Sequence, residues 1–139
     1  YDILFRLTES LTRDYAQKKE LFRRACLNVL ACNRDDHLKN FAFLMGPNGV
    51  WRLAPLFDFT FHTGPNGWQT LSVAGEGQNP RREHLLKLAD QVDLRLRDAT
   101  EIIEQVRDAV AAFGKLASKL KLSKAMTDRV RSRLKAIGV

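Results

Sequence analysis

Apolar residues recur with the period of an α-helix in several stretches of the chain. Between residues 13 and 31 they follow the i, i+3, i+4 spacing of one buried helix face, while most charged residues occupy other positions. The same spacing returns at 95–113, and helices are also predicted over about 81–93 and 123–136, the last with Ser123 as its N-cap. The C-terminal half is therefore predicted to be a helical bundle.

One part of the chain has the pattern of a β-hairpin. Residues 41–45 (FAFLM) and 50–53 (VWRL) are apolar runs, and the turn-forming residues 46–49 (GPNG) separate them. This is the clearest hairpin signal in the sequence, and Phe41 and Trp51 are expected to belong to its core.

Residues 59–80 are rich in glycine, proline and asparagine, and only 71–73 (LSV) resembles a fragment of a strand. We expect a long structured loop here, and loops of this length in compact domains are often functional. Residues 75–77 (GEG) are expected to form a turn within it. Trp68 is the residue of this loop best suited to contact a partner.

The composition fits one ordered domain or one lobe of a larger enzyme, since 45% of the 139 residues are hydrophobic. No apolar run reaches the length of a membrane span and no signal-peptide pattern opens the chain, so we predict a cytoplasmic protein that does not contact a membrane. The chain begins at Tyr1 without an initiator methionine, which suggests an excised fragment, a processed product or missing upstream residues.

Two cysteines, Cys26 and Cys32, fall six positions apart in the first predicted helix. That spacing separates them by roughly 9 Å along a helix, too far for a disulfide. Both are expected to be small buried hydrophobic residues.

The net charge of +7 is concentrated near the C-terminus. Residues 115–139 carry eight lysines and arginines and one aspartate, whereas 1–114 carry fifteen charges of each sign. The basic tail has two interpretations: a solvated helix face, or a contact surface for nucleic acid or for an acidic protein. No motif that reads bases accompanies it.

The residues with the clearest chemistry lie in 33–40 (NRDDHLKN) and 53–58 (LAPLFD). An Asp, an Asn five residues later and a second Asp beyond a hairpin are what a protein kinase uses to orient a hydroxyl and to bind magnesium. Asp35, Asn40 and Asp58 satisfy that order and spacing. The usual His-Arg-Asp and Asp-Phe-Gly triplets are missing, which disfavours an ordinary eukaryotic-type kinase.

Neighbouring residues leave alternatives open. Asp36 is either a rival base or a solvated neighbour or helper, but the five-residue offset to Asn40 selects Asp35. His37 can contact the nucleotide or serve in packing, and a zinc site is not expected because no ligand-spaced partner exists. Lys39 can contact phosphate or lie along the surface.

These stretches, together with residues 73–80 (VAGEGQNP), resemble the C-terminal lobe of HipA-type serine/threonine kinases, the toxins of bacterial toxin–antitoxin modules. The resemblance covers at least residues 1 to about 95. It implies that Asp35 is the catalytic residue and that Asn40 and Asp58 bind magnesium. The residues that it implies for the ATP site are His37, Leu38, Lys39, Asn40, Phe57 and Asp58.

Three positions depart from the commoner forms of that family. Arg34 stands where threonine is frequent, Asp36 where some members have glycine, and Phe57 where tyrosine is usual. Loss of the phenolic hydroxyl at 57 removes one hydrogen bond and keeps the ring.

The resemblance implies an α+β, mainly helical fold: the C-terminal lobe of a protein-kinase-like fold, with a short β-hairpin carrying the metal site. We expect one lobe over 1–139, divided into a helical opening (1–32), the catalytic loop, hairpin and metal-binding Asp (33–60), a long loop (61–80) and a helical bundle with the basic tail (81–139). Residues 1–32 supply no phosphate-covering loop or phosphate-binding lysine. The fragment is therefore expected to need an upstream lobe, fused or separate, for activity.

Two functions are consistent with the sequence. The first, implied by the resemblance, is ATP- and magnesium-dependent phosphorylation of a protein hydroxyl, with an aminoacyl-tRNA synthetase as substrate and a HipB-like helix-turn-helix antitoxin as partner. DNA would be contacted indirectly through the antitoxin, helped by the basic tail over 115–135. The alternative is a non-catalytic lobe that docks on the antitoxin or on DNA.

Overall fold

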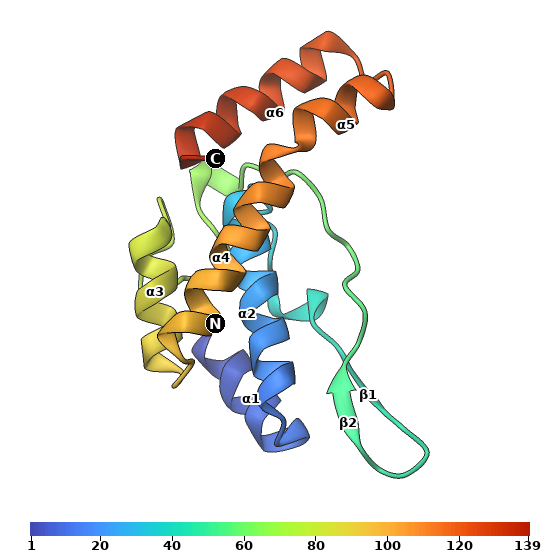
Figure 1. Cartoon of the computed structure of the whole chain (residues 1–139), viewed down its shortest axis with the longest axis vertical. Helices are drawn as coiled ribbons and strands as arrows, with labels where there is room; N and C mark the ends of the chain where they lie inside the picture. Colours follow the sequence, from blue (N-terminus) through green and yellow to red (C-terminus); the bar gives the residue numbers. More distant parts are fainter.

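Helix α2 (Tyr15–Leu30) is the centre of the fold, which a computed structural model describes for all residues 1–139 (Figure 1). Helices α1, α3 and α4 pack around it, a hairpin projects near one end, and α5 and α6 lie at the other end. The other elements are α1 (Asp2–Thr12), the 3-10 turn η1 (Leu38–Asn40), β1 (Phe43–Met45), β2 (Trp51–Leu53), the 3-10 turn η2 (Pro65–Gly67), α3 (Arg82–Gln91), α4 (Leu96–Ala111), α5 (Phe113–Lys119) and α6 (Lys124–Ile137). The predicted mainly helical α+β class is confirmed.

The apolar face of α2 forms the middle of a core of 22 buried residues. Leu21 and Phe22 are completely buried, which stabilises the fold by about 2–3 kcal/mol for each side chain. Asp14 caps the helix by accepting a hydrogen bond from the Ala16 amide at 2.8 Å. Helix α4 lies along α2, and its predicted apolar stripe faces the core.

Helix α2 ends in a Schellman motif that starts the loop carrying the candidate chemistry. The amide of Asn33 donates to the carbonyl of Asn28 at 2.8 Å, and that of Cys32 to Val29 at 3.3 Å. Cys32 adopts the left-handed conformation that glycine usually takes in this motif, with φ of 57°, at a cost of about 1 kcal/mol. Cys32 therefore lies beyond the helix and not within it, while both Cys26 and Cys32 are free and buried as expected.

The sequence missed one helix boundary and did not resolve α1 as a separate helix within the helical opening predicted over 1–32. Arg13, in the left-handed region with φ of 49°, separates α1 from α2. The helix predicted over 95–113 stops at Ala111, and a separate helix, α5, begins at Phe113. The predicted cap of the last helix is confirmed, because the Ser123 hydroxyl accepts from the Met126 amide at 3.3 Å.

The predicted hairpin is confirmed, with strands shorter than the apolar runs 41–45 and 50–53. Strands β1 and β2 are antiparallel, with Phe43 opposite Leu53 and Met45 opposite Trp51. Phe41 is half-buried against the core and Trp51 is half-buried. Met45 is 60% exposed, so the far side of the hairpin faces solvent.

The long loop forms a turn at residues 73–76, slightly earlier in the chain than the turn expected at 75–77. Val73 and Glu76 pair through their backbones, and Ala74 and Gly75 between them have positive φ values of 51° and 89°. The Glu76 carboxylate accepts hydrogen bonds from the amides of Asn79 and Gln78, which lower its pKa. Trp68 is 50% exposed, and its partner contact stays a prediction.

A buried carboxylate ties three parts of this fold together. Asp36 is 0% exposed, which overturns the interpretation of it as a solvated neighbour. Its Oδ2 accepts from the Tyr1 hydroxyl at 2.5 Å and from Gln69 Nε2 at 2.9 Å, and its Oδ1 accepts from the amides of Thr70 and Leu71, both at 3.1 Å. Four donors match the capacity of an ionised carboxylate, so no cation is needed.

Asn28 on α2 extends this network. Its Nδ2 donates to the Tyr1 hydroxyl at 3.0 Å, and its Oδ1 accepts from Asn33 Nδ2 at 3.0 Å. The start of α1, helix α2 and the loop after α2 are thus joined through buried polar side chains.

None of the α-helices combines the length and apolar character that crossing a bilayer requires.

Replacing Asp36 by Asn is expected to destabilise the chain by about 3 kcal/mol, because the negative charge is lost and the new NH₂ group cannot accept the hydrogen bonds that one of the two oxygens now accepts. Chemical denaturation measures the free energy of unfolding. Asp35→Asn is the matched control, since its half-buried carboxylate forms no ion pair, and it should change stability by less than about 0.5 kcal/mol. Equal stability losses in the two variants would contradict this role of Asp36.

The Tyr1 phenol predicts a specific loss of stability at high pH. Burial and the neighbouring Asp36 carboxylate hold its pKa well above the ordinary value of 10.0. Above the ordinary pKa the unfolded chain releases this proton while the folded chain keeps it, so stability falls by about 1.4 kcal/mol per pH unit from this group. Denaturation curves between about pH 9 and pH 11 should therefore fall less steeply with pH for Tyr1→Phe than for the parent; parallel curves would rule this out.

Candidate active site

Asp35 and Asn40 are brought together by a direct hydrogen bond. Asn40 Nδ2 donates to the backbone carbonyl of Asp35 at 3.0 Å. The 3-10 turn η1 makes this possible, because the Asn40 amide bonds to the carbonyl of His37 at 2.9 Å and folds the chain back. With its NH₂ group directed at Asp35, the Asn40 side chain keeps its Oδ1 as a free acceptor.

Backbone hydrogen bonds hold the start of the 33–40 loop on two sides. The Arg34 amide donates to the carbonyl of His62 at 2.9 Å, and the Arg34 carbonyl accepts from the Thr70 amide at 3.2 Å. Gly64 lets the later loop fold back tightly and approach Arg34, because a Cβ there would lie 1.9 Å from the Trp68 carbonyl oxygen and 3.0 Å from Arg34 Cβ. The loop that carries Asp35 is therefore a fixed part of the fold.

Asp58 lies at the middle of a segment, 54–62, whose two ends both meet this loop region. At one end the Ala54 amide donates to the carbonyl of Ala42 at 2.8 Å, two residues after Asn40. At the other end His62 pairs with the backbone on either side of Asn33. Asp58 is four positions from each end, so the chain cannot carry it more than about 14 Å from either.

The backbone of Asp58 is strained. Its φ of 52° is in the left-handed region, which few residues other than glycine, asparagine and aspartate adopt. The residue is exposed, and no hydrogen bond or ion pair within the chain occupies its carboxylate. Strained conformations of this kind cluster at ligand-binding sites.

The structure shows no direct contact between Asp58 and either Asp35 or Asn40. Two carboxylates and one amide oxygen are nevertheless the ligand types that hard divalent cations take. No cluster of three or more His, Cys, Asp or Glu side chains is arranged to hold a metal. A cation at this site would take its remaining ligands from water or from a bound phosphate.

The other predicted nucleotide-site residues differ in exposure. His37 is half-buried, and its Nδ1 is buried without a partner. Leu38 is 48% exposed, Lys39 is exposed without an ion pair, and Phe57 is 42% exposed. Leu38, Lys39 and Phe57 are thus open to a ligand, while the turn η1 holds His37, Leu38 and Lys39 next to one another.

Sequence reasoning missed the residues that support the loop. Arg34 is buried, and its Nη1 donates to the carbonyl of Gln78 at 2.9 Å, so the loop is fastened to the later part of the chain. Burial and the nearby Arg133 lower the pKa of this guanidinium. A signal was present for Asn28, a polar residue between apolar neighbours on α2. No local pattern points to Gln69.

A family model described as the HipA-like C-terminal domain matches residues 1–113. A curated Haemophilus influenzae protein named "Putative kinase" is 46% identical over 44 residues, which are 32% of this chain and 13% of that protein. The match thus spans a small part of the relative's length. No solved structure matches the chain significantly.

The family match covers most of the chain and includes the 33–40 loop, the hairpin and Asp58. The protein therefore belongs to the HipA-like C-terminal domain family.

Proposed function

We propose that this chain is the catalytic lobe of an ATP- and magnesium-dependent protein serine/threonine kinase. The observation that supports this most directly is the hydrogen bond from Asn40 Nδ2 to the Asp35 carbonyl. It fixes the two residues whose spacing suggested phosphoryl transfer, and it leaves Oδ1 of Asn40 and the Asp35 carboxylate free of partners within the chain.

The available oxygens suit magnesium. Asn40 Oδ1 and the Asp58 carboxylate would hold the ion, which usually binds proteins through one or two side chains and completes its shell with water and substrate phosphates. When bound, magnesium would neutralise the charge that develops on the transferring phosphoryl group.

Asp35 would act on the acceptor hydroxyl. In the transfer, a bond forms between the hydroxyl oxygen and the γ-phosphorus, the bond from that phosphorus to the bridging oxygen of ADP breaks, and Asp35 accepts the hydroxyl proton. The partly exposed Asp35 can reach a substrate, whereas the adjacent Asp36 is enclosed and has four donors on its oxygens.

The nucleotide would lie against residues 37–40 and Phe57. Lys39 is an exposed cation beside the proposed phosphate position, and the Phe57 side chain offers an apolar surface to the base or ribose. The principal hollows of this chain are lined by other residues. A second lobe, fused or separate, would therefore complete the nucleotide cleft.

The finer assignments rest on the resemblance to HipA-type toxins. They are an aminoacyl-tRNA synthetase as the phosphorylated protein, a HipB-like antitoxin as the partner, and operator DNA bound through that antitoxin. Binding of antitoxin or DNA by a gene product without any nucleotide affinity would favour a docking module instead.

Asp58→Asn tests the metal role without disturbing the backbone, because asparagine also tolerates the left-handed conformation. In the gene product that contains this chain, the change should lower magnesium-dependent kcat/KM by about 100-fold or more, measured by phosphate transfer from labelled ATP. Asp93→Asn is a matched control: Asp93 is also an exposed aspartate with positive φ, 53°, in the α3–α4 connection. It should retain full activity, and equal losses in both variants would argue against the metal role.

Asp35→Asn should separate chemistry from binding. We expect kcat to fall by about 10²- to 10⁴-fold, because the proton acceptor is lost. The Kd for magnesium-ATP, measured by calorimetry, should change less than about threefold, since the Asn40 bond uses the Asp35 backbone. Full activity in this variant would remove Asp35 from the mechanism.

A further inference from the structure

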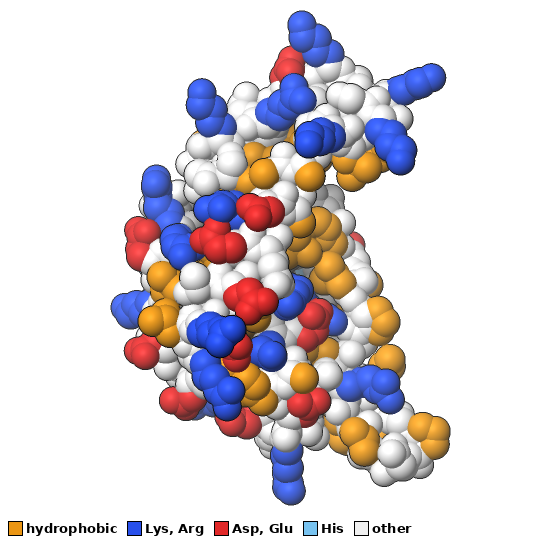
Figure 2. Space-filling view, viewed as in Figure 1, with side chains coloured by type: hydrophobic (Ala, Val, Ile, Leu, Met, Phe, Trp, Pro, Cys, Tyr) orange, Lys and Arg blue, Asp and Glu red, His pale blue; other side chains and the backbone are white.

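A hollow apart from the candidate active site is lined only by hydrophobic residues. It has a volume of about 310 Å³ and receives side chains from α2, from the 54–62 segment, from α4, α5 and α6, and from Ala112. We call it the apolar groove, and its lining is Leu27, Ala31, Phe59, Phe61, Ala109, Val110, Ala112, Phe113, Leu116, Val130 and Leu134. Figure 2 shows orange side chains lining a concave face below the α5–α6 end of the molecule.

The outer edge of the apolar groove is open to water. Leu116 on α5 is 53% exposed and Phe59 is 41% exposed. Leu120, one turn after Leu116, is 60% exposed and continues the apolar surface beyond the groove. A contiguous apolar surface of this kind typically marks a place where another molecule binds.

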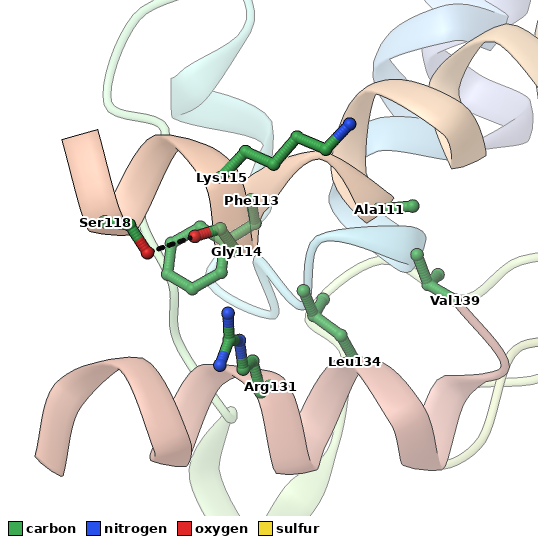
Figure 3. A pocket seen from close by; sticks show the side chains of 8 residues that line it. All are labelled: Ala111, Phe113, Gly114, Lys115, Ser118, Arg131, Leu134 and Val139. Atoms are coloured by element: carbon green, nitrogen blue, oxygen red, sulfur yellow. Dashed lines mark hydrogen bonds between the residues drawn. The ribbon is translucent and has the colours of Figure 1, made fainter. Parts of the chain in front are cut away.

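Cations flank the apolar groove. The guanidinium of Arg129 lies 6.0 Å from the centre of the Phe61 ring, which is part of the lining. Lys115 and Arg131 line a second hollow that shares two groove residues, Phe113 and Leu134, with the first (Figure 3).

Arg131 is held at this place by close packing on α5. A Cβ at Gly114 would lie only 2.6 Å from Arg131 Nη2, so the glycine is what lets the guanidinium approach the helix. Arg131 forms no ion pair there. Its charge is therefore positioned beside the groove and not compensated within the chain.

The same lack of compensation extends to the whole tail. None of the eight lysines and arginines of 115–139 forms a salt bridge, and the segment contains a single acidic residue. Figure 2 shows these cations spread over the α5–α6 end. A ligand matched to this region must bring negative charge as well as apolar side chains.

We propose that the apolar groove binds an amphipathic helix of a partner protein, with leucine-like residues on one face and acidic residues beside them. Leu116 on α5 and Leu120 at its C-cap form an i, i+4 ridge that fits between side chains of a helix lying alongside. Nucleic acid would satisfy the cations and leave the exposed hydrophobic side chains at the groove's edge, such as Leu116 and Phe59, in water, so an acidic helix accounts for both features.

The probe is a synthetic helical peptide of about 18 residues, with leucines at i, i+3, i+4 and i+7 and glutamates on the flanks. Fluorescence anisotropy measures its binding to the 139-residue chain. Leu116→Gln should weaken binding about tenfold. The double variant Arg129→Gln with Arg131→Gln should weaken it about tenfold at low salt and less at high salt.

Matched controls use residues of similar exposure outside the groove. Leu44→Gln, on the hairpin and 52% exposed, should bind the peptide as the parent does. Arg97→Gln combined with Lys87→Gln, on α4 and α3, controls for a general loss of positive charge. A peptide with lysines in place of the glutamates should bind at least about tenfold more weakly.

Three results would overturn the proposal: no binding of the acidic peptide, equal binding of the lysine peptide, or equal losses in the control variants. Duplex DNA is the competing probe. One outcome would assign the basic surface to nucleic acid and make the proposed partner helix wrong. In that outcome DNA binding requires Arg129 and Arg131, Leu116→Gln does not change it, and the acidic peptide does not bind.

Discussion

The structure depends most on the buried carboxylate of Asp36. Its four hydrogen bonds join the start of α1, the loop after α2 and residues 69–71, which are far apart in the sequence. A buried charge is tolerated only when donors fully satisfy it, so these segments must assemble together for the carboxylate to be enclosed. The burial of Asp36 also decides which of the two adjacent aspartates is available to the candidate site. With Asp36 occupied in the interior, Asp35 remains the accessible carboxylate of the pair.

Each of the two segments of the candidate site contains or follows a residue in the left-handed conformation. Cys32 turns the chain out of α2, and Asp58 interrupts the extended 54–62 segment. Each conformation costs about 1 kcal/mol or more, which interactions elsewhere in the fold must offset. At Cys32 the Schellman bonds and complete burial provide that compensation. At Asp58 no side-chain hydrogen bond or ion pair within the chain contributes, and the same is true of the exposed Asp93, so the backbone conformation alone does not identify a ligand site.

The sequence predicted elements whose cause is local and missed those whose cause is tertiary. The stripe of α2, the GPNG turn and the Ser123 cap each have their reason within a few residues, and the structure confirms them. The burial of Asp36 depends on Gln69 and Tyr1, which are more than thirty residues away in the sequence. Without those partners, nothing in the local sequence distinguishes Asp36 from Asp35 as the buried aspartate. The same holds for the site. The spacing in the sequence selected Asp35 and Asn40, and the hydrogen bond between them is local. The position of Asp58 relative to them instead depends on how the 54–62 segment crosses the molecule.

The 54–62 segment also links the candidate active site to the apolar groove. Phe59 and Phe61 line the apolar groove, and Asp58, the proposed magnesium ligand, directly precedes Phe59. If the proposed kinase function holds, a helix in the groove contacts the same short piece of chain that positions the metal ligand. Such a helix would alter nucleotide affinity only if it bound the nucleotide-loaded and empty forms of this segment differently. By thermodynamic reciprocity, nucleotide would then change the affinity of the groove for the partner helix by the same factor. Binding of the helix and binding of ATP would thus be coupled through the conformation of residues 58–61.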